Sequence, residues 1–301
     1  MTHSGTLACG RYQLKLSRPI VMGIINTTPD SFSDGGRYAN HDAARLAIDS
    51  MIDAGVDIID IGGESTRPGA TPVPVQQEID RVIPLIETLR DCGKPLSIDT
   101  YKPQVMQAAI ACGVDMINDV RALTTPGAIT AITPSNCALI IMHMAGDPHT
   151  MQLKPSYQNI MTELQSFFQE RLKVLDQAGV SKQRILIDPG FGFGKNLAHN
   201  LDLLRHLTNF TPLGLPLVAG LSRKSMLGTI TGKAADQRQA ASIAATVLAA
   251  EYGATVHRVH DVAAHVDALK IWSAVHEKPW CESIATRISP TERSTSNKSN
   301  T

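Results

Sequence analysis

The sequence predicts an α/β fold, a (β/α)8 TIM barrel with an N-terminal hairpin and a disordered C-terminal tail. Eight short apolar, β-prone runs recur along the 301-residue chain, and each ends at or near a polar or charged side chain. Segments with helical periodicity separate the runs, and this alternation favours parallel strands with crossover helices. The expected strands are Val21–Asn26, Asp57–Asp60, Leu96–Asp99, Asp115–Asn118, Ala138–His143, Arg184–Asp188, Leu217–Ser222 and Val256–His260.

The helices between these strands have recognisable ends. Glycines at positions 55, 113 and 253 each come shortly before an expected strand. Glycine takes the left-handed conformation after a last helical turn without Cβ strain, so each is expected to end a helix. Asn40 is expected to cap a helix over His41–Ala54, and Pro103 suits the first turn of a helix over Pro103–Cys112.

Length and composition set the domain organisation. One barrel domain is predicted over residues 1–284, because α/β barrels commonly reach about 250 residues as one unit. Residues 5–18 are predicted to form a hairpin that closes the barrel bottom. Residues 285–301 are rich in Ser, Thr and Asn, which predicts a disordered tail. An open doubly wound sheet stays an alternative, because strand order cannot be read from one sequence.

Charge and cysteine usage exclude several classes of protein. The 28 basic residues balance the 28 acidic ones, so no long-range attraction to nucleic acid or to an anionic membrane is expected. The five cysteines are odd in number and never spaced as Cys-x-x-Cys, which argues against a zinc ribbon or a disulfide framework. The first 20 residues lack the apolar core of a signal peptide. A reducing cytoplasm is therefore the expected compartment.

Two long connections follow the first two expected strands. Loops of this type usually take about 2–6 residues, so Thr27–Asn40 and Gly62–Val75 are candidate lids or binding loops. The first contains Asp34 among turn-forming residues, and an ordinary turn is its alternative interpretation. The second places Arg67 between a hydroxyl and a proline. Its guanidinium would suit a phosphate or carboxylate, although a solvated surface charge is the alternative.

Positive charge gathers at the ends of the last two expected strands. The segment Ser222–Ser225 contains Arg223 and Lys224, while Arg258 and His260 lie two residues apart and therefore on one side of a strand. In barrels the loops after strands seven and eight often bind phosphate. An anionic substrate is expected there, with ordinary surface charges as the alternative.

Acceptor groups close three of the middle strands. Asp99, Asn118 and Asp188 each end an apolar run, and a glycine-rich turn containing Phe193 follows Asp188. Such groups can simply cap the next helix. Carboxylates and an amide that converge in a cleft would instead suit a flat heterocycle rich in N–H donors, such as a guanine-like or pterin-like ring.

Several familiar motifs are excluded by spacing. The segment Gly190–Gly194 does not match GxGxxG, and Gly194–Asn196 lacks the earlier glycine and the hydroxyl residue of a P-loop. His143 and His149 lack an HExxH pattern or a carboxylate partner, so a polar loop is a better interpretation than a metal site.

Seven segments, taken in order, resemble those of the bacterial dihydropteroate synthases. The resemblance covers residues 18–277. The matching segments are Met22–Gly36, Gly62–Gly69, Ile117–Asp119, Met142–Met144, Asp188–Asn196, Ser222–Ser225 and Arg258–Asp261.

The resemblance implies a transferase of folate biosynthesis that condenses 6-hydroxymethyl-7,8-dihydropterin diphosphate with p-aminobenzoate to give 7,8-dihydropteroate and pyrophosphate. It implies a pterin site, a diphosphate site and a p-aminobenzoate site. The pterin residues would be Asp99, Asn118, Asp188 and Lys224; Arg258 and His260 would bind the diphosphate beside Mg2+ held by Asn26; Thr66, Arg67, Pro68, Phe193 and Ser225 would form the p-aminobenzoate side. The expected catalytic residues are Asp188, Lys224 and Asp34.

The family resemblance also implies a homodimer and a sulfonamide target. The alanine-rich helix Ala234–Tyr252 and the helix Val262–Val275 are the candidates for the dimer contact. Two other functions stay open: a methyltransferase that uses methyltetrahydrofolate on the same pterin-binding barrel, and a non-catalytic pterin-binding protein. Neither accounts for a cationic site of the size of a diphosphate.

Overall fold

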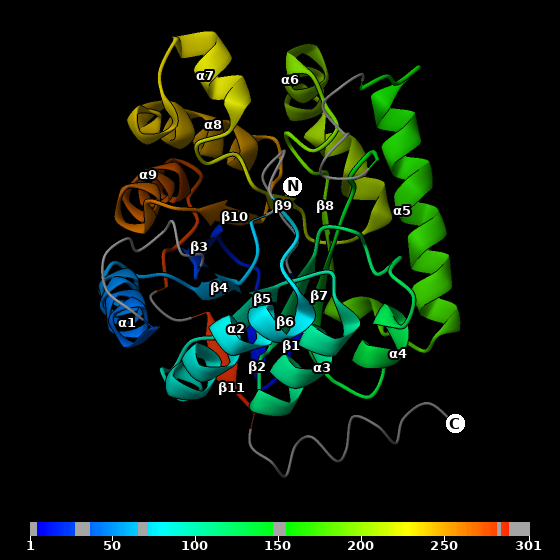
Figure 1. Cartoon of the computed structure of the whole chain (residues 1–301). Helices are drawn as coiled ribbons and strands as arrows, with labels where there is room; N and C mark the ends of the chain where they lie inside the picture. Colours follow the sequence, from blue (N-terminus) through cyan, green and yellow to red (C-terminus); the bar gives the residue numbers. More distant parts are fainter. Residues whose placement is uncertain (1–4, 28–36, 66–70, 147–154, 282–283, 289–301) are drawn as a thin grey trace.

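The computed structural model of the chain describes residues 5–27, 37–65, 71–146, 155–281 and 284–288. Eight parallel strands form one sheet in the order β8-β7-β6-β5-β4-β3-β10-β9. A parallel bridge between Ile187 and Leu217 joins the two ends of this sheet and closes the barrel. The helices surround the ring of strands (Figure 1). The predicted (β/α)8 barrel is therefore confirmed, and the open doubly wound sheet is excluded.

The observed elements follow the sequence prediction closely. The barrel strands are β3 (Ile20–Asn26), β4 (Ile58–Gly62), β5 (Leu96–Asp99), β6 (Met116–Asp119), β7 (Ala138–Met142), β8 (Ile185–Asp188), β9 (Val218–Ala219) and β10 (Val256–Val259). The helices are α1 (Arg37–Asp53), α2 (Val75–Leu89), α3 (Pro103–Cys112), α4 (Ala128–Ile132), α5 (Ile160–Gln177), α6 (Leu197–Arg205), α7 (Ser225–Thr231), α8 (Gln239–Glu251) and α9 (Val262–Val275), with short 3-10 turns at Lys182–Arg184, Leu207–Leu213 and Ala235–Gln237.

Glycines end helices as the sequence predicts, whereas one expected helix start is wrong. Gly55, Gly113 and Gly253 have φ values of 90°, 95° and 96°, in the left-handed region. The helix expected to begin after Asn40 already includes Arg37, so Asn40 lies inside α1 and is not its cap. A good capping residue type does not fix a helix start when the preceding residues can also adopt helical backbone angles.

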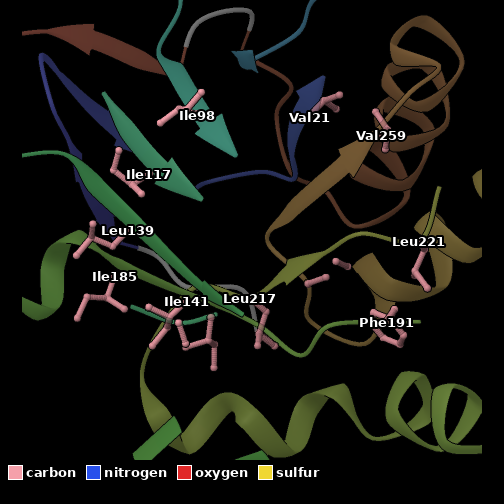
Figure 2. Close-up of a cluster of buried hydrophobic side chains, with 14 of the residues drawn as sticks. Val21, Ile98, Ile117, Leu139, Ile141, Ile185, Phe191, Leu217, Leu221 and Val259 are labelled. Atoms are coloured by element: carbon pink, nitrogen blue, oxygen red, sulfur yellow. The ribbon is translucent and has the colours of Figure 1, made fainter. Parts of the chain in front are cut away.

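Side chains alternate between two apolar layers along each strand. Val21 belongs to the outer layer against the helices, whereas Ile20 and Met22 belong to the inner one. Figure 2 shows part of the outer layer, including Ile117 and Leu139 on neighbouring strands. Side chains two positions apart on a strand point to the same side. Residues that lie two or four positions after an inner-layer residue therefore also point into the barrel.

A small antiparallel sheet covers the bottom of the barrel. It consists of β1 (Thr6–Cys9), β2 (Tyr12–Lys15) and β11 (Ala285–Arg287), in the order β1-β2-β11. Leu7 and Leu14 of the first two strands pack into the inner apolar layer. The hairpin predicted over residues 5–18 is thus confirmed as the bottom of the barrel.

The disordered tail predicted over residues 285–301 is wrong at its start, because residues 285–287 form a strand. Ala285 and Arg287 pair with Leu14 and Tyr12 of β2. The prediction rested on side-chain composition, but backbone N–H and C=O groups suffice to add an edge strand. Residues 289–301 lie outside the described part of the chain.

No helix in the described ranges combines the length and the apolar character that a membrane span requires.

Candidate active site at the barrel mouth

Strand periodicity brings most of the predicted site residues to one place. Ile58, Met116 and Leu186 face the inner layer. The residues two positions later are Asp60, Asn118 and Asp188, so these polar groups line the mouth at the carboxyl ends of β4, β6 and β8. The same alternation directs Asp99 of β5, Arg258 of β10 and Asn26 of β3 inward.

Arg258 joins two carboxylates across the mouth. Its Nε atom lies 2.7 Å from Oδ2 of Asp60, and its Nη2 atom lies 2.7 Å from Oδ2 of Asp99. Asn118 adds a longer hydrogen bond, 3.4 Å from Nδ2 to Oδ2 of Asp60. The sequence predicts acceptors on one side of the site and cations on the other, and that separation is wrong. The long arginine side chain on β10 reaches carboxylates on two other strands.

Asp60 is a site residue that the sequence analysis missed. It is fully buried and carries an ion pair with Arg258. Its signal was present in the sequence, because Asp60 ends its expected strand in the same way as Asp99 ends the third. The sequence alone does not single out Asp60, because its place beside Arg258 becomes evident only once the strand order is known.

The two carboxylates that bind Arg258 each keep one oxygen without a protein partner. Oδ1 of Asp60 and Oδ1 of Asp99 are buried and accept no hydrogen bond from any described residue. Burial raises the pKa of Asp99 to about 7, against the opposing effect of Arg258 and with a further increase from Asp60. Unpartnered buried acceptors are costly unless a ligand or water satisfies them, so these oxygens mark a place for hydrogen-bond donors.

Asp188 begins the glycine-rich loop. Its Oδ1 atom accepts a 2.7 Å hydrogen bond from the Gly190 N–H, while its Oδ2 atom faces Gly220. The carboxyl group is buried, and this burial raises its pKa despite the hydrogen bond from Gly190 and the charge of Lys224. Asp188 thus makes the turn and also presents a carboxyl group at the mouth.

Phe193 and Lys224 meet beside this loop. The Lys224 Nζ atom lies 4.0 Å from the centre of the Phe193 ring, a cation–π contact. Gly192 has a positive φ of 79°, and a Cβ atom there would lie 3.2 Å from Cδ of Lys224. The absence of a side chain at Gly192 therefore lets Lys224 lie close to the loop. Ser225 follows Lys224 as the first residue of α7 and is exposed.

A buried lysine holds the same loop from behind. The Lys195 Nζ atom donates to the carbonyls of Gly190 and Phe193, each at 3.0 Å, and lies 3.1 Å from Nδ1 of His143. Burial lowers the pKa of Lys195 to about 7 and, together with the charge of Lys195, lowers that of His143 to about 3. His143 follows an inward-facing Met142 and therefore points outward, where its ring contacts Phe167 of α5.

The positively charged segment after β9 makes contacts within the protein that the sequence does not predict. Arg223, with a left-handed φ of 59°, forms an ion pair with Asp261 at 2.6 Å. His260 places Nδ1 3.0 Å from the hydroxyl of Ser222. The ends of the last two barrel strands are therefore tied together.

Asn26 offers one oxygen ligand at the end of β3. Its Oδ1 atom lies 3.4 Å from the position that a Cβ atom on Gly62 would take, so the neighbouring strand leaves space around this oxygen. Among the described residues no group of three or more His, Cys, Asp or Glu side chains could hold a metal ion. Mg2+ takes oxygen ligands and usually keeps several waters beside substrate phosphates, so the amide oxygen of Asn26 is of the type that Mg2+ binds.

Four predicted site residues, Asp34, Thr66, Arg67 and Pro68, lie outside the described residues.

Comparisons with known proteins show the family of this chain. Residues 22–260 match the family described as pterin binding enzyme. The dihydropteroate synthase of Haemophilus influenzae is 46% identical over 264 residues, which cover 87% of this chain and 95% of that protein.

Solved structures agree in fold as well as in sequence. The Yersinia pestis dihydropteroate synthase, solved with a sulfonamide drug complex, aligns with a TM-score of 0.87 and 46% identity over 91% of this chain and 100% of that one. The Burkholderia cenocepacia dihydropteroate synthase, complexed with 7,8-dihydropteroate, aligns with a TM-score of 0.84 and 49% identity over 91% of this chain and 97% of that one. The chain therefore belongs to the pterin-binding enzyme family and, within it, to the dihydropteroate synthases.

Proposed function

We propose that the barrel mouth condenses 6-hydroxymethyl-7,8-dihydropterin diphosphate with p-aminobenzoate, giving 7,8-dihydropteroate and pyrophosphate. The observation that carries this proposal is the pair of unpartnered buried oxygens on Asp60 and Asp99, next to Asn118 and Asp188. A pterin ring presents several N–H donors on one edge, and these acceptors would satisfy them away from water. The family membership and the dihydropteroate complex of the Burkholderia relative support the same substrate.

The pterin would lie with its polar edge toward the strand ends. Asp99, Asn118 and Asp188 would accept from or donate to the ring, and Lys224 would donate from above Phe193. Oδ1 of Asp60 would also accept from the ring, while its Oδ2 atom, together with Asp99, holds the Arg258 guanidinium. Two carboxylates around one guanidinium keep this arginine charged and fixed in position.

The diphosphate would extend toward the ends of β3 and β10. His260 and Arg258 would contribute positive charge or hydrogen bonds, and Asn26 would hold Mg2+ beside the phosphates. When bound, Mg2+ would neutralise part of the charge on the diphosphate. Phe193, Ser225 and the second-loop residues Thr66, Arg67 and Pro68 would form the side that receives p-aminobenzoate.

Ionisation of the pterin diphosphate would come first in the reaction. The C–O bond to the diphosphate breaks, both electrons leave with pyrophosphate, and the electron-rich ring shares the positive charge on carbon. Asp188, with Asp34 from the first loop, would stabilise this cation electrostatically. The neutral amine of p-aminobenzoate then forms the new C–N bond and releases its extra proton, so no strong general base is needed.

The proposal is tested by release of pyrophosphate from purified protein given both substrates. Pyrophosphate is expected only when p-aminobenzoate and Mg2+ are both present. Release without p-aminobenzoate would indicate simple hydrolysis, and absence of release would rule out the synthase. Methyl transfer from methyltetrahydrofolate serves as the negative control for the related methyltransferase activity.

We also propose a homodimer formed through α8 and α9. Three apolar side chains on these helices are exposed: Leu248 on α8, and Ile271 and Val275 on α9, the last two at 68% and 74%. Ile271 and Val275 lie four residues apart and thus share one helix face. Light scattering at micromolar concentration tests this assembly, and a monomer would contradict it.

We further propose that the enzyme is cytoplasmic. The cysteine usage supports this, because the five cysteines are odd in number and never spaced as Cys-x-x-Cys. Fractionation of cells that express the protein would check the location.

A further inference from the structure

A strained turn follows β6, shortly after the candidate pterin residue Asn118. Ala122 and Leu123 have φ values of 51° and 58°, so two successive residues with side chains adopt the left-handed region. A Cβ atom makes this region unfavourable, and residues other than glycine usually visit it singly. Such conformations persist only where the surrounding structure holds them, and they cluster at functional sites. The strain at Ala122 and Leu123 must therefore be offset by the contacts of the turn.

Asp119 holds the N–H groups of this turn. Its carboxylate is fully buried, and it accepts hydrogen bonds of 2.8 Å from the Arg121 N–H at Oδ1 and from the Leu123 N–H at Oδ2. The Asp119 carbonyl accepts a further 3.0 Å bond from the Ala122 N–H. Burial raises the pKa of Asp119 to about 6, although the two N–H groups at its carboxylate act against this increase. Both carboxylate oxygens of Asp119 thus have partners, and both partners belong to the turn.

Arg171 on α5 holds the carbonyl groups of the same turn. Its Nε atom donates to the Ala122 carbonyl at 3.0 Å, and its Nη2 atom donates to the Leu123 carbonyl at 3.1 Å. A guanidinium is planar and presents its N–H donors in a fixed geometry, which suits the carbonyls of two adjacent residues. The two strained residues are therefore held at their N–H groups by Asp119 and at their carbonyls by Arg171.

The backbone, more than the side-chain contacts, places Asn118 at the mouth. Its Nδ2 atom lies 3.4 Å from Oδ2 of Asp60, a long hydrogen bond that orients the amide weakly. Its carbonyl accepts a 3.0 Å bond from the Thr100 N–H, so its backbone is held more closely than its side chain. Asp119 is the next residue in the chain and points to the opposite side of the strand. A movement of the turn would therefore carry the Asn118 amide with it.

We propose that Asp119 and Arg171 are positioning residues for the pterin, because they hold the strained turn that fixes the end of β6 and with it the amide of Asn118. This inference rests on the proposed function. Neither side chain faces the mouth, since Asp119 points out of the barrel and Arg171 lies on α5, outside the ring of strands (Figure 1). An amide held in place before the substrate arrives loses less entropy on binding, so the loss of either support should weaken pterin binding.

Arg171 and Arg184 provide a matched pair of variants. Arg184 also donates from Nε to a backbone carbonyl, that of Cys137 at 2.9 Å, but it lies just before β8, at the bottom of the barrel. Burial lowers the pKa of both arginines. Arg171→Met is expected to raise the KM for the pterin diphosphate about tenfold, while the KM for p-aminobenzoate changes less than about twofold. Arg184→Met is expected to lower the melting temperature at least as much and to leave both KM values within about twofold.

Asp119→Asn provides a second variant in case Arg171→Met does not fold. An amide has one acceptor oxygen, so it cannot replace both carboxylate oxygens that bind the N–H groups of Arg121 and Leu123. We expect an increase of about fivefold in the KM for the pterin diphosphate. The inference is overturned if neither variant of the turn changes this KM, if both KM values rise together, or if Arg184→Met changes it as much as Arg171→Met does. Failure of the proposed function is a separate outcome, because the unmodified protein would then release no pyrophosphate.

Discussion

Each end of the barrel holds an arginine bound to buried aspartate, but the two arrangements differ in whether every carboxylate oxygen has a partner. At the bottom, Arg18 binds Asp57 through its two Nη atoms, each at 2.8 Å, and Asp57 also accepts from the Val21 N–H. At the mouth, Arg258 binds Asp60 and Asp99, but each carboxylate retains an oxygen with no partner among the described residues. The bottom pair is complete without a ligand, whereas the mouth cluster is complete only when donors arrive from outside.

The difference shows how a buried ion pair can be assigned a role. Arg11 and Asp115 repeat the pattern of the bottom, since Arg11 and the Leu96 N–H together engage both oxygens of Asp115. Completed pairs near the covered end of a barrel point to stability, and incomplete ones at the carboxyl ends of the strands point to binding. The predictions below test this division, from the largest expected effect to the smallest.

Asp188→Asn should separate catalysis from folding at the mouth. The amide keeps the shape of the side chain but removes the charge proposed to stabilise the pterin cation. We expect the rate to fall by a factor of about 100 or more, the range found when one electrostatic stabiliser is removed. Steady-state pyrophosphate release measures the loss, and circular dichroism with the melting temperature serves as the folding control. Near-normal turnover would refute the catalytic assignment.

Arg18→Met should show the reverse behaviour at the bottom. Arg18 and Asp57 are almost fully buried, so the variant leaves an uncompensated carboxylate, and the loss in unfolding free energy should be about 3–5 kcal/mol. Urea unfolding measures it. The KM values of the folded fraction should stay unchanged, and a marked rise in either KM would break the distinction between the two ends. The double variant with Asp57→Leu should recover part of the stability.

The pH dependence of pterin binding should report on Asp99. Its pKa of about 7 means that the carboxyl group becomes protonated at lower pH and loses the negative charge that strengthens its hydrogen bonds from the ring. The KM for the pterin diphosphate should therefore rise about tenfold from pH 8 to pH 6. Stability should change in the opposite direction, since a raised aspartate pKa favours the folded state at low pH and this contribution is lost as the pH rises to about 7. Asp99→Asn is the control, because it removes the titrating group and should flatten the pH profiles of both the KM and the stability. The assignment is contradicted if the variant and the unmodified protein give the same profiles.

The pH dependence of stability should report on Lys195, with no change in either KM. Its pKa is lowered to about 7 in the folded protein, so the unfolded chain binds more protons above that pH. Stability should rise between about pH 7 and pH 10, and the rise should be smaller in Lys195→Met. Thermal melts at matched ionic strength measure the difference. Parallel curves for the two proteins would mean that Lys195 keeps an ordinary pKa.

Strand positions were predictable because each depends on a local pattern. The alternation of apolar residues, with glycine after each helix, located the strands and the direction of Asp99, Asn118 and Asp188. The pairing of Arg258 with Asp60 was not predictable, because it joins strands about 200 residues apart in the sequence. Lys195 supports a loop whose Gly190 and Phe193 are only five and two residues away, but its burial beside His143, 52 residues earlier, depends on tertiary packing that the sequence does not show.

Two other errors have physical causes of their own. Asn40 is a favourable capping residue that lies inside α1, because the helix extends beyond it. Ala285–Arg287 form a strand without large apolar side chains, because pairing with β2 needs only the backbone. Residue type identifies possible ends of elements, and tertiary contacts choose among them.

The bottom sheet also bears on how the chain folds during its synthesis. β2 cannot pair with its second neighbour, β11, until roughly 270 further residues have been synthesised. β3 likewise cannot pair with β10 until that late strand is made. At about 5–20 residues per second the ribosome needs roughly 15–55 seconds for that interval. During this time the apolar face of the N-terminal hairpin has only part of its final cover. A nascent chain of this protein is therefore expected to need protection from aggregation until its last strands emerge.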